Sequence, residues 1–326
     1  MKYLAHVTIC AAVAASLGGC VVQGGADDSS DLEQDVTTTY VNILDFANTD
    51  QGQWYDVIHS LNAQFNSECG DTFCEGDWSN LIPLTFGCSV TSKAGNVKDC
   101  IWTFAATQVD VDTRNAAVLV DSPTFQCHIA MKTTAVKLAK LLSTATDKLR
   151  TPLPGAPASA PSINEQLSKC FDHPIGAVPN VLSTTGTESY MSARDYYTSA
   201  AGQNRWYAAR AALHAGFENV CSDTFCSSDF SDLQDMDFTC SVTKSTGNVK
   251  TCTWTLGGSY YVVPEHGGAI DETVKTWKCD VPVRGTLSKL LDTLNAPAAP
   301  GQPDAIHRPL PGGTATAYDA LAACFH

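Results

Sequence analysis

The chain is poor in basic residues. It has 20 lysines and arginines against 34 aspartates and glutamates, so its formal net charge is −14. A nucleic-acid-binding protein needs a basic surface that neutralises phosphates, and attraction to an anionic membrane surface needs one as well. We therefore expect no nucleic acid among the partners, and no membrane contact that depends on charge.

The sequence also lacks the short motifs of several enzyme classes. Neither Gly-x-Ser-x-Gly nor His-Glu-x-x-His occurs, so the nucleophile elbow of α/β-hydrolases and the zinc site of many metalloproteases are missing. Cys-x-x-Cys is absent too, and no group of cysteines and histidines has the spacing of zinc ligands. These absences favour a protein without enzymatic activity.

The N-terminus resembles the leader of a bacterial lipoprotein. The run from Tyr3 to Leu17 carries no formal charge, but it is too short to remain as a membrane-spanning helix. It ends in Leu17-Gly18-Gly19-Cys20, which is similar to a lipobox, where cleavage precedes a cysteine that carries the lipid. The resemblance implies a signal peptide over 1–19 and a lipid anchor on Cys20. Ordinary secretion, with cleavage after Ala14, is the alternative.

The residues after this cysteine predict an anchored protein. Val21 stands where an aspartate, by analogy with lipoproteins, would indicate retention in the inner membrane. The resemblance thus implies the outer membrane or the cell surface. Residues 20–35 contain much Gly, Asp and Ser, a composition that cannot bury a core, and we expect a lipid-anchored flexible tether. The membrane is then contacted through the N-terminal lipid only.

The rest of the chain is an internal duplication. Residues 54–103 align without a gap to 206–255, at a constant offset of 152, and half of the positions are identical. The match includes Cys69-Gly-Asp-Thr-Phe-Cys74 against Cys221-Ser-Asp-Thr-Phe-Cys226. Each copy is long enough to fold as a domain. We expect a first cysteine-rich repeat domain over 36–173, a linker over 174–187 and a second repeat domain over 188–326.

Hydrophobic periodicity predicts an α+β fold for each repeat, with a helix packed on an antiparallel β-meander and closing helices. Apolar residues at helical spacing predict the first helix over 54–69 and its copy over 206–221. Alternating apolar residues predict the strands. In the first repeat the strands are expected over 84–90, 100–104 and 125–131, and the closing helices over 138–142 and 163–171.

The cysteines predict a disulfide framework. Cys10 leaves with the leader and Cys20 takes the lipid, which leaves six cysteines in each repeat. An even number in an exported chain is typical of disulfides. Facing positions on the expected elements favour Cys88–Cys100 and Cys127–Cys170, which leaves Cys69–Cys74 as a short local loop. The equivalent pairs in the second repeat are Cys240–Cys252, Cys279–Cys324 and Cys221–Cys226. Six cysteines allow fifteen pairings, and exchange of Cys69 with Cys88 or Cys100 is the main alternative.

A loop after each first helix carries acidic residues. Asp71 and Asp77 lie there in the first repeat, and Asp223 and Asp229 occupy the same places in the second. Carboxylates in such a loop are candidate ligands for calcium, the only cofactor that we consider. They are also a candidate carboxylate pair for glycoside hydrolysis. The alternative is structural, because Asp71 and Asp223 are suited to capping a helical turn.

The repeated runs Cys-Gly-Asp-Thr-Phe-Cys-Glu-Gly-Asp and Cys-Ser-Val-Thr are similar to those of exported cysteine-rich bacterial proteins of unassigned function. We expect an envelope-anchored, non-enzymatic lipoprotein that binds a protein or a glycan, because duplicated domains offer avidity. One alternative is an exported polysaccharide hydrolase that uses Asp71 and Asp77. Another is an envelope protease inhibitor that presents the hairpin tips near Ala94 and Thr246.

Overall fold

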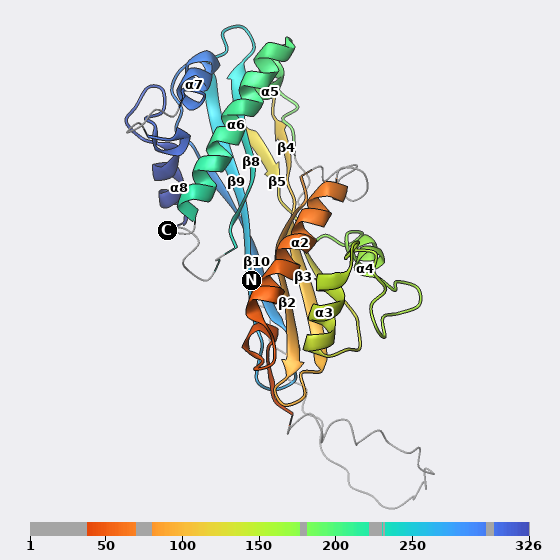
Figure 1. Cartoon of the computed structure of the whole chain (residues 1–326). Coiled ribbons are helices and arrows are strands. Elements are labelled where there is room, and N and C mark those ends of the chain that lie inside the picture. Colours follow the sequence, from red (N-terminus) through yellow and green to blue (C-terminus); the bar gives the residue numbers. More distant parts are fainter. Residues whose placement is uncertain are drawn as a thin grey trace, which may run out of the picture. The chain divides into compact units, whose positions relative to one another are not determined.

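The structure of the chain is a computed structural model, and its α+β fold agrees with the prediction (Figure 1). Residues 38–69, 80–176, 181–221, 230, 232–297 and 303–325 are described. The predicted signal peptide, the Cys20 anchor and the tether lie outside these residues. Residues Thr38–His326 form one compact unit. No helix in the described part of the chain is long and apolar enough to cross a bilayer.

The first repeat packs helix α2 (Gln51–Cys69) on a four-stranded antiparallel sheet, where the sequence had predicted a helix over 54–69. The strand order is β1-β2-β3-β6. The strands are β1 (Tyr40–Asn42), β2 (Ile82–Thr91), β3 (Val97–Ala105) and β6 (Thr124–His128). The remaining elements are the 3-10 helix η1 (Ile43–Asp45), the hairpin β4 (Gln108–Val111) and β5 (Val118–Asp121), and the helices α3 (Ala135–Thr144) and α4 (Ile163–Cys170).

The second repeat builds the same arrangement, with helix α6 (Ala200–Cys221) on a sheet of order β10-β9-β8-β7. Its strands are β7 (Tyr190–Ser192), β8 (Gln234–Thr243), β9 (Val249–Val262) and β10 (Asp271–Asp280). Its other elements are α5 (Ala193–Tyr196), α7 (Leu287–Leu294), the 3-10 helix η3 (Ala305–His307) and α8 (Ala317–Phe325). In Figure 1, α2 crosses β2 and β3 as α6 crosses β8 and β9.

Aromatic side chains fill the space between helix and sheet in both repeats. Trp54 of α2 stacks on Phe86 of β2 with ring centroids 5.7 Å apart, and the equivalent Trp206 and Phe238 lie 5.9 Å apart. All five tryptophans that the sequence placed on core faces are buried: Trp54, Trp102, Trp206, Trp254 and Trp277. They therefore pack in the cores of the two repeats, as the sequence predicted.

Four of the six expected disulfides are present in the described residues. They are Cys88–Cys100, Cys127–Cys170, Cys240–Cys252 and Cys279–Cys324. Cys88 and Cys100 face each other across β2 and β3, and Cys127–Cys170 joins β6 to α4. Cys221 is also disulfide-bonded. Its expected partner Cys226, like Cys74 and the side chain of Cys69, lies outside the described residues.

Each repeat carries a two-stranded arm that the periodicity did not predict. In the second repeat the arm is the far half of the continuous β9–β10 hairpin, where Tyr261 pairs with Glu272. In the first repeat it is the separate β4–β5 hairpin, where Val109 pairs with Val120 at the same offset of 152. Pro123 stands at the break between β5 and β6. Because proline has no N–H for the ladder, it ends the strand there.

The two repeats exchange their arms reciprocally. Ser89 of β2 donates a hydrogen bond from Oγ to the Gly268 carbonyl in the arm of the second repeat. Its equivalent Ser241 in β8 donates to the Ala116 carbonyl in the arm of the first repeat, at 2.6 Å. Each contact maps onto the other at the offset of 152. The repeats therefore join as the halves of a two-fold interface do.

Replacement of Gly268 tests the arm exchange. Gly268 has φ +71°, and a Cβ there would lie 2.7 Å from the ring of Tyr40. We expect Gly268→Ala to lower the free energy of unfolding by about 1–3 kcal/mol, through left-handed strain and this overlap. Ala116 already has φ 68° at the equivalent place, so Ala116→Gly should be neutral or stabilising. Denaturant titration measures both, and equal stabilities for Gly268→Ala and the native chain would contradict the expectation.

Candidate functional site

The acidic residues that the sequence analysis selected, Asp71, Asp77, Asp223 and Asp229, lie outside the described residues. Within the described ranges, no group of three or more histidine, cysteine, aspartate or glutamate side chains is suited to hold a metal ion. The calcium site and the carboxylate-based hydrolase therefore stay predictions. At the predicted inhibitor tips, Ala94 and Thr246 are exposed, and each tip is tied to its repeat by backbone hydrogen bonds.

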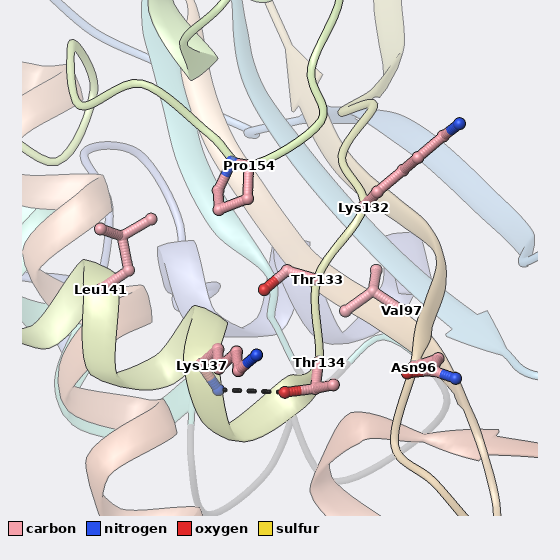
Figure 2. Close-up of a pocket in the computed structure, with 8 residues that line it drawn as sticks. All are labelled: Asn96, Val97, Lys132, Thr133, Thr134, Lys137, Leu141 and Pro154. Carbon is pink, nitrogen blue, oxygen red and sulfur yellow. Dashed lines mark hydrogen bonds between the residues drawn. The ribbon is translucent and has the colours of Figure 1, made fainter.

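A cavity of about 600 Å³ lies beside the N-terminus of α3. Figure 2 shows that its polar groups do not converge, because the Lys132 side chain extends away from α3. Thr134 is engaged in capping the helix, since its Oγ1 accepts from the Lys137 backbone N–H at 3.4 Å. This cavity offers no set of side chains that would orient a ligand.

A second cavity, of about 570 Å³, lies where the arm of the first repeat meets α5, α6 and β8 of the second. We call it the interrepeat cleft. Polar side chains dominate its lining, which consists of Asn80, Thr107, Gln108, Val109, Asp110, Val111, Ser192, Arg194, Asp195, Trp206, Tyr207, Arg210, Asp237 and Thr239. Its volume is in the range of small-molecule binding sites, about 300–1,000 Å³.

An ion pair forms one wall of the interrepeat cleft. Arg210 reaches from α6 to Asp237 of β8, where Nη2 contacts the Oδ1 atom. The Asp237 side chain is 10% exposed and that of Arg210 is 32% exposed. A β-bulge lies between Asp235 and Asp237 of β8. Asp235 pairs with Leu256 and Asp237 pairs with Thr255, so two steps along β8 correspond to one step along β9. Bulges re-aim side chains, and this one sets the direction of the Asp237 carboxylate.

A second arginine and carboxylate pair comes from α5. Arg194 Nε donates to Asp195 Oδ1 at 2.9 Å, and Nη2 donates to Oδ2 at 3.4 Å. This two-point hydrogen bond raises the pKa of Arg194 above its ordinary value. Ser192 caps the short helix by accepting from the Arg194 N–H at 3.3 Å. An arginine has five N–H donors, and two of those of Arg194 are bonded to Asp195.

The mouth of the interrepeat cleft presents an aromatic ring. Tyr207 of α6 is 51% exposed and lines the cleft. A tyrosine combines an apolar ring face with a hydroxyl that bonds to polar ligands. The lining thus offers ring face, hydroxyls, amides, guanidinium groups and carboxylates together. Because a sugar hydroxyl both donates and accepts hydrogen bonds, this mixture suits a hydroxyl-rich ligand.

A connected polar chain of residues from α6, β8 and β9 lies next to the cleft. Asp235 of β8 accepts from Trp254 Nε1 through Oδ1, and its Oδ2 lies 3.1 Å from His214 Nδ1. In the first repeat Pro83 stands in place of Asp235. There, within the described residues, the buried Trp102 Nε1 has no hydrogen-bond acceptor. Among the described residues, the second repeat thus has polar partners for this tryptophan where the first repeat has none.

The residues of the interrepeat cleft are not among those predicted from the sequence. A signal was present in the aligned repeats, where Ile58 corresponds to Arg210 and Thr85 to Asp237. Around these positions the two repeats share their cysteines and tryptophans. A charged residue in one repeat where the other has an uncharged residue therefore indicates a position whose role differs between the repeats. Only the structure shows that Arg210 and Asp237 contact each other.

Comparison of the chain with models of protein families, with curated proteins and with solved structures finds no match. Its function has to be inferred from its own residues.

The Arg210–Asp237 pair can be dissected by copying the first repeat. We expect Arg210→Ile alone to lower the free energy of unfolding by about 1–3 kcal/mol, because it leaves a nearly buried carboxylate without its cation. Adding Asp237→Thr restores the pair found at Ile58 and Thr85 and should recover most of the loss. Denaturant titration of both variants measures the coupling. A double variant less stable than Arg210→Ile would contradict this account.

The titration of His214 provides a test beside the cleft. The hydrogen bond that protonated His214 donates to the Asp235 carboxylate raises the pKa of His214, and partial burial opposes this shift. A raised pKa in the folded state means that protonated His214 stabilises the fold below about pH 6.5, the ordinary value. That contribution is lost as the pH rises through the folded-state pKa. Proton NMR of the imidazole should show the raised pKa, and Asp235→Asn should lower it; an unchanged value in this variant would disprove the assignment.

Proposed function

We propose that this protein is an envelope-anchored, non-enzymatic lipoprotein that binds a glycan of the cell envelope in the interrepeat cleft. The observation that carries the proposal is the lining of that cleft. Two guanidinium groups, carboxylates, hydroxyls and an exposed tyrosine ring surround about 570 Å³. These are the groups that bind the hydroxyls and the apolar ring faces of sugars.

Binding fits the described residues better than catalysis does. Glycoside hydrolysis needs a pair of carboxyl groups that flank the scissile bond. In the interrepeat cleft, Asp195 and Asp237 each contact an arginine, so each of these carboxylates is held in an ion pair. The same pairs give the cleft fixed donors and acceptors, as a binding site requires.

A glycan fits the cleft better than a folded protein partner does. The site is a concavity of small-molecule size, whereas a stable protein–protein interface buries about 1,200–2,000 Å² in total. Both repeats contribute to it, since Val109 lies in the arm of the first and Tyr207 in α6 of the second. The duplication thus serves to build one site at the seam between the repeats.

Location and anchoring support the same proposal. Four disulfides in the described residues indicate an exported protein, because such bonds persist in oxidising compartments. Leu17-Gly18-Gly19-Cys20 resembles a lipobox, and we extend this to a lipid on Cys20 at the outer membrane or the cell surface. The membrane would then be reached through the lipid alone, and the cleft would lie near envelope polysaccharide.

Retention on envelope material tests the function. We expect the mature chain, with its disulfides formed and held in detergent, to be retained on purified envelope polysaccharide and not on envelope protein. The Arg210→Ile/Asp237→Thr variant, which replaces one wall of the cleft, should be retained less. Loss of retention under a calcium chelator would indicate instead that binding depends on calcium held by Asp71 and Asp223. No retention on polysaccharide, or release of sugar products from it, would contradict a non-enzymatic glycan-binding protein.

A further inference from the structure

The first repeat contains a counterpart of the interrepeat cleft, and a tyrosine of the chain itself occupies it. Tyr261 in the arm of the second repeat corresponds to Val109 in the arm of the first. The pairing register proves the correspondence, because Tyr261 pairs with Glu272 and Val109 with Val120, all at the offset of 152. Tyr261 therefore stands against the first repeat where Val109 stands against the second.

The Tyr261 ring fits its place closely. Gly87 of β2 makes the room, since a Cβ there would lie 2.1 Å from Cζ of the ring. The phenol donates a hydrogen bond to Asn42 Oδ1 at 3.0 Å. Burial raises the pKa of Tyr261 to about 12, so the hydroxyl keeps its proton and remains a donor. A six-membered ring with one directed hydroxyl thus fills the counterpart of the cleft.

In the interrepeat cleft the same positions hold other side chains. Val109 replaces the tyrosine and Thr239 replaces Gly87. Ser192 stands in place of Asn42, because β1 and β7 pair with β2 and β8 in the same register. Its Oγ caps the following helix as Asn42 Oδ1 does. The acceptor is therefore retained in the cleft, while the ring that would donate to it is not part of the chain.

We infer that the interrepeat cleft binds a pyranose ring in the place that the Tyr261 ring takes in the first repeat, with one ring hydroxyl directed at Ser192. This inference rests on the proposed glycan-binding function and specifies its geometry. The bound unit is one sugar residue of a longer chain, because a cavity of about 570 Å³ exceeds the size of a single ring.

The changes around the ring position favour a sugar over a phenol. Ile58 and Thr85 lie at positions where the cleft has Arg210 and Asp237. An aromatic ring would leave those donors and acceptors that Arg210 and Asp237 do not use on each other without a partner, which is costly. A pyranose carries hydroxyls on most of its carbons and bonds to both partners. Tyr207 offers a ring face against which the C–H face of the sugar packs.

The experiment fills the cleft with the same side chains that fill its counterpart in the first repeat. Val109→Tyr combined with Thr239→Gly reproduces the Tyr261 and Gly87 pair. Saturation-transfer NMR on the mature chain in detergent measures binding of the methyl glycosides of glucose, galactose, mannose and N-acetylglucosamine, with p-cresol as the aromatic probe. We expect at least one glycoside to bind the native chain and the double variant to bind it at least about tenfold more weakly. Tyr261→Phe, outside the cleft, is the matched control and should bind as the native chain does.

The possible outcomes separate the inference from the proposed function. Unchanged glycoside binding in the double variant, or binding of p-cresol alone, overturns the inference. If none of the glycosides binds while the native chain is retained on envelope polysaccharide, the inference is also wrong and the proposed function stands. If neither binding nor retention is seen, both fail. Should the double variant not melt cooperatively, Ser192→Ala replaces it and should weaken glycoside binding about fivefold; unchanged binding in Ser192→Ala overturns the inference as well.

Discussion

The exchange of arms between the repeats is the contact on which the rest of the structure depends. A four-stranded sheet has two faces, and in each repeat a helix covers only one of them. The second face of each sheet is covered by the arm of the other repeat, so β2 is buried along most of its length rather than at alternate residues. Ser89 and Ser241 are fully buried on these covered faces. Neither repeat completes its burial alone, which explains why both form one compact unit.

Two-fold exchange of arms also creates two equivalent places at the seam, and the chain uses them differently. At one place Tyr261 closes the space against the first repeat. Beside it, Ser259 in the same arm bonds Thr103 at 2.8 Å and Asp232 at 2.9 Å, in a buried network that fixes the arm. At the other place Val109 is too small to close the space, and the cleft remains. One of the two equivalent places at the seam thus contributes to stability, and the other is the site of the proposed binding.

The charges follow the same division. The second repeat carries two arginine–carboxylate pairs at the cleft and the connected Trp254, Asp235 and His214 beside it. Such pairs, whether exposed like Arg194–Asp195 or largely buried like Arg210–Asp237, contribute little net stability compared with apolar packing, but they fix donors and acceptors in one geometry. Such a fixed arrangement is useful for recognising a ligand. In the first repeat the apolar Ile58 stands at the position of Arg210, and the corresponding space is filled by packed side chains.

Short-range periodicity and cysteines repeated at a constant offset were enough to predict the long helix of each repeat, the facing strands and disulfides such as Cys88–Cys100. The arms and the cleft arise only when the two repeats pack against each other. Ser89 and Gly268 are 179 residues apart and Ser241 and Ala116 are 125 apart, and no local pattern states which sheet an arm will cover. Among the side chains that differ between the two places at the seam are Val109 and Tyr261, and the effect of this difference appears only where the two repeats meet.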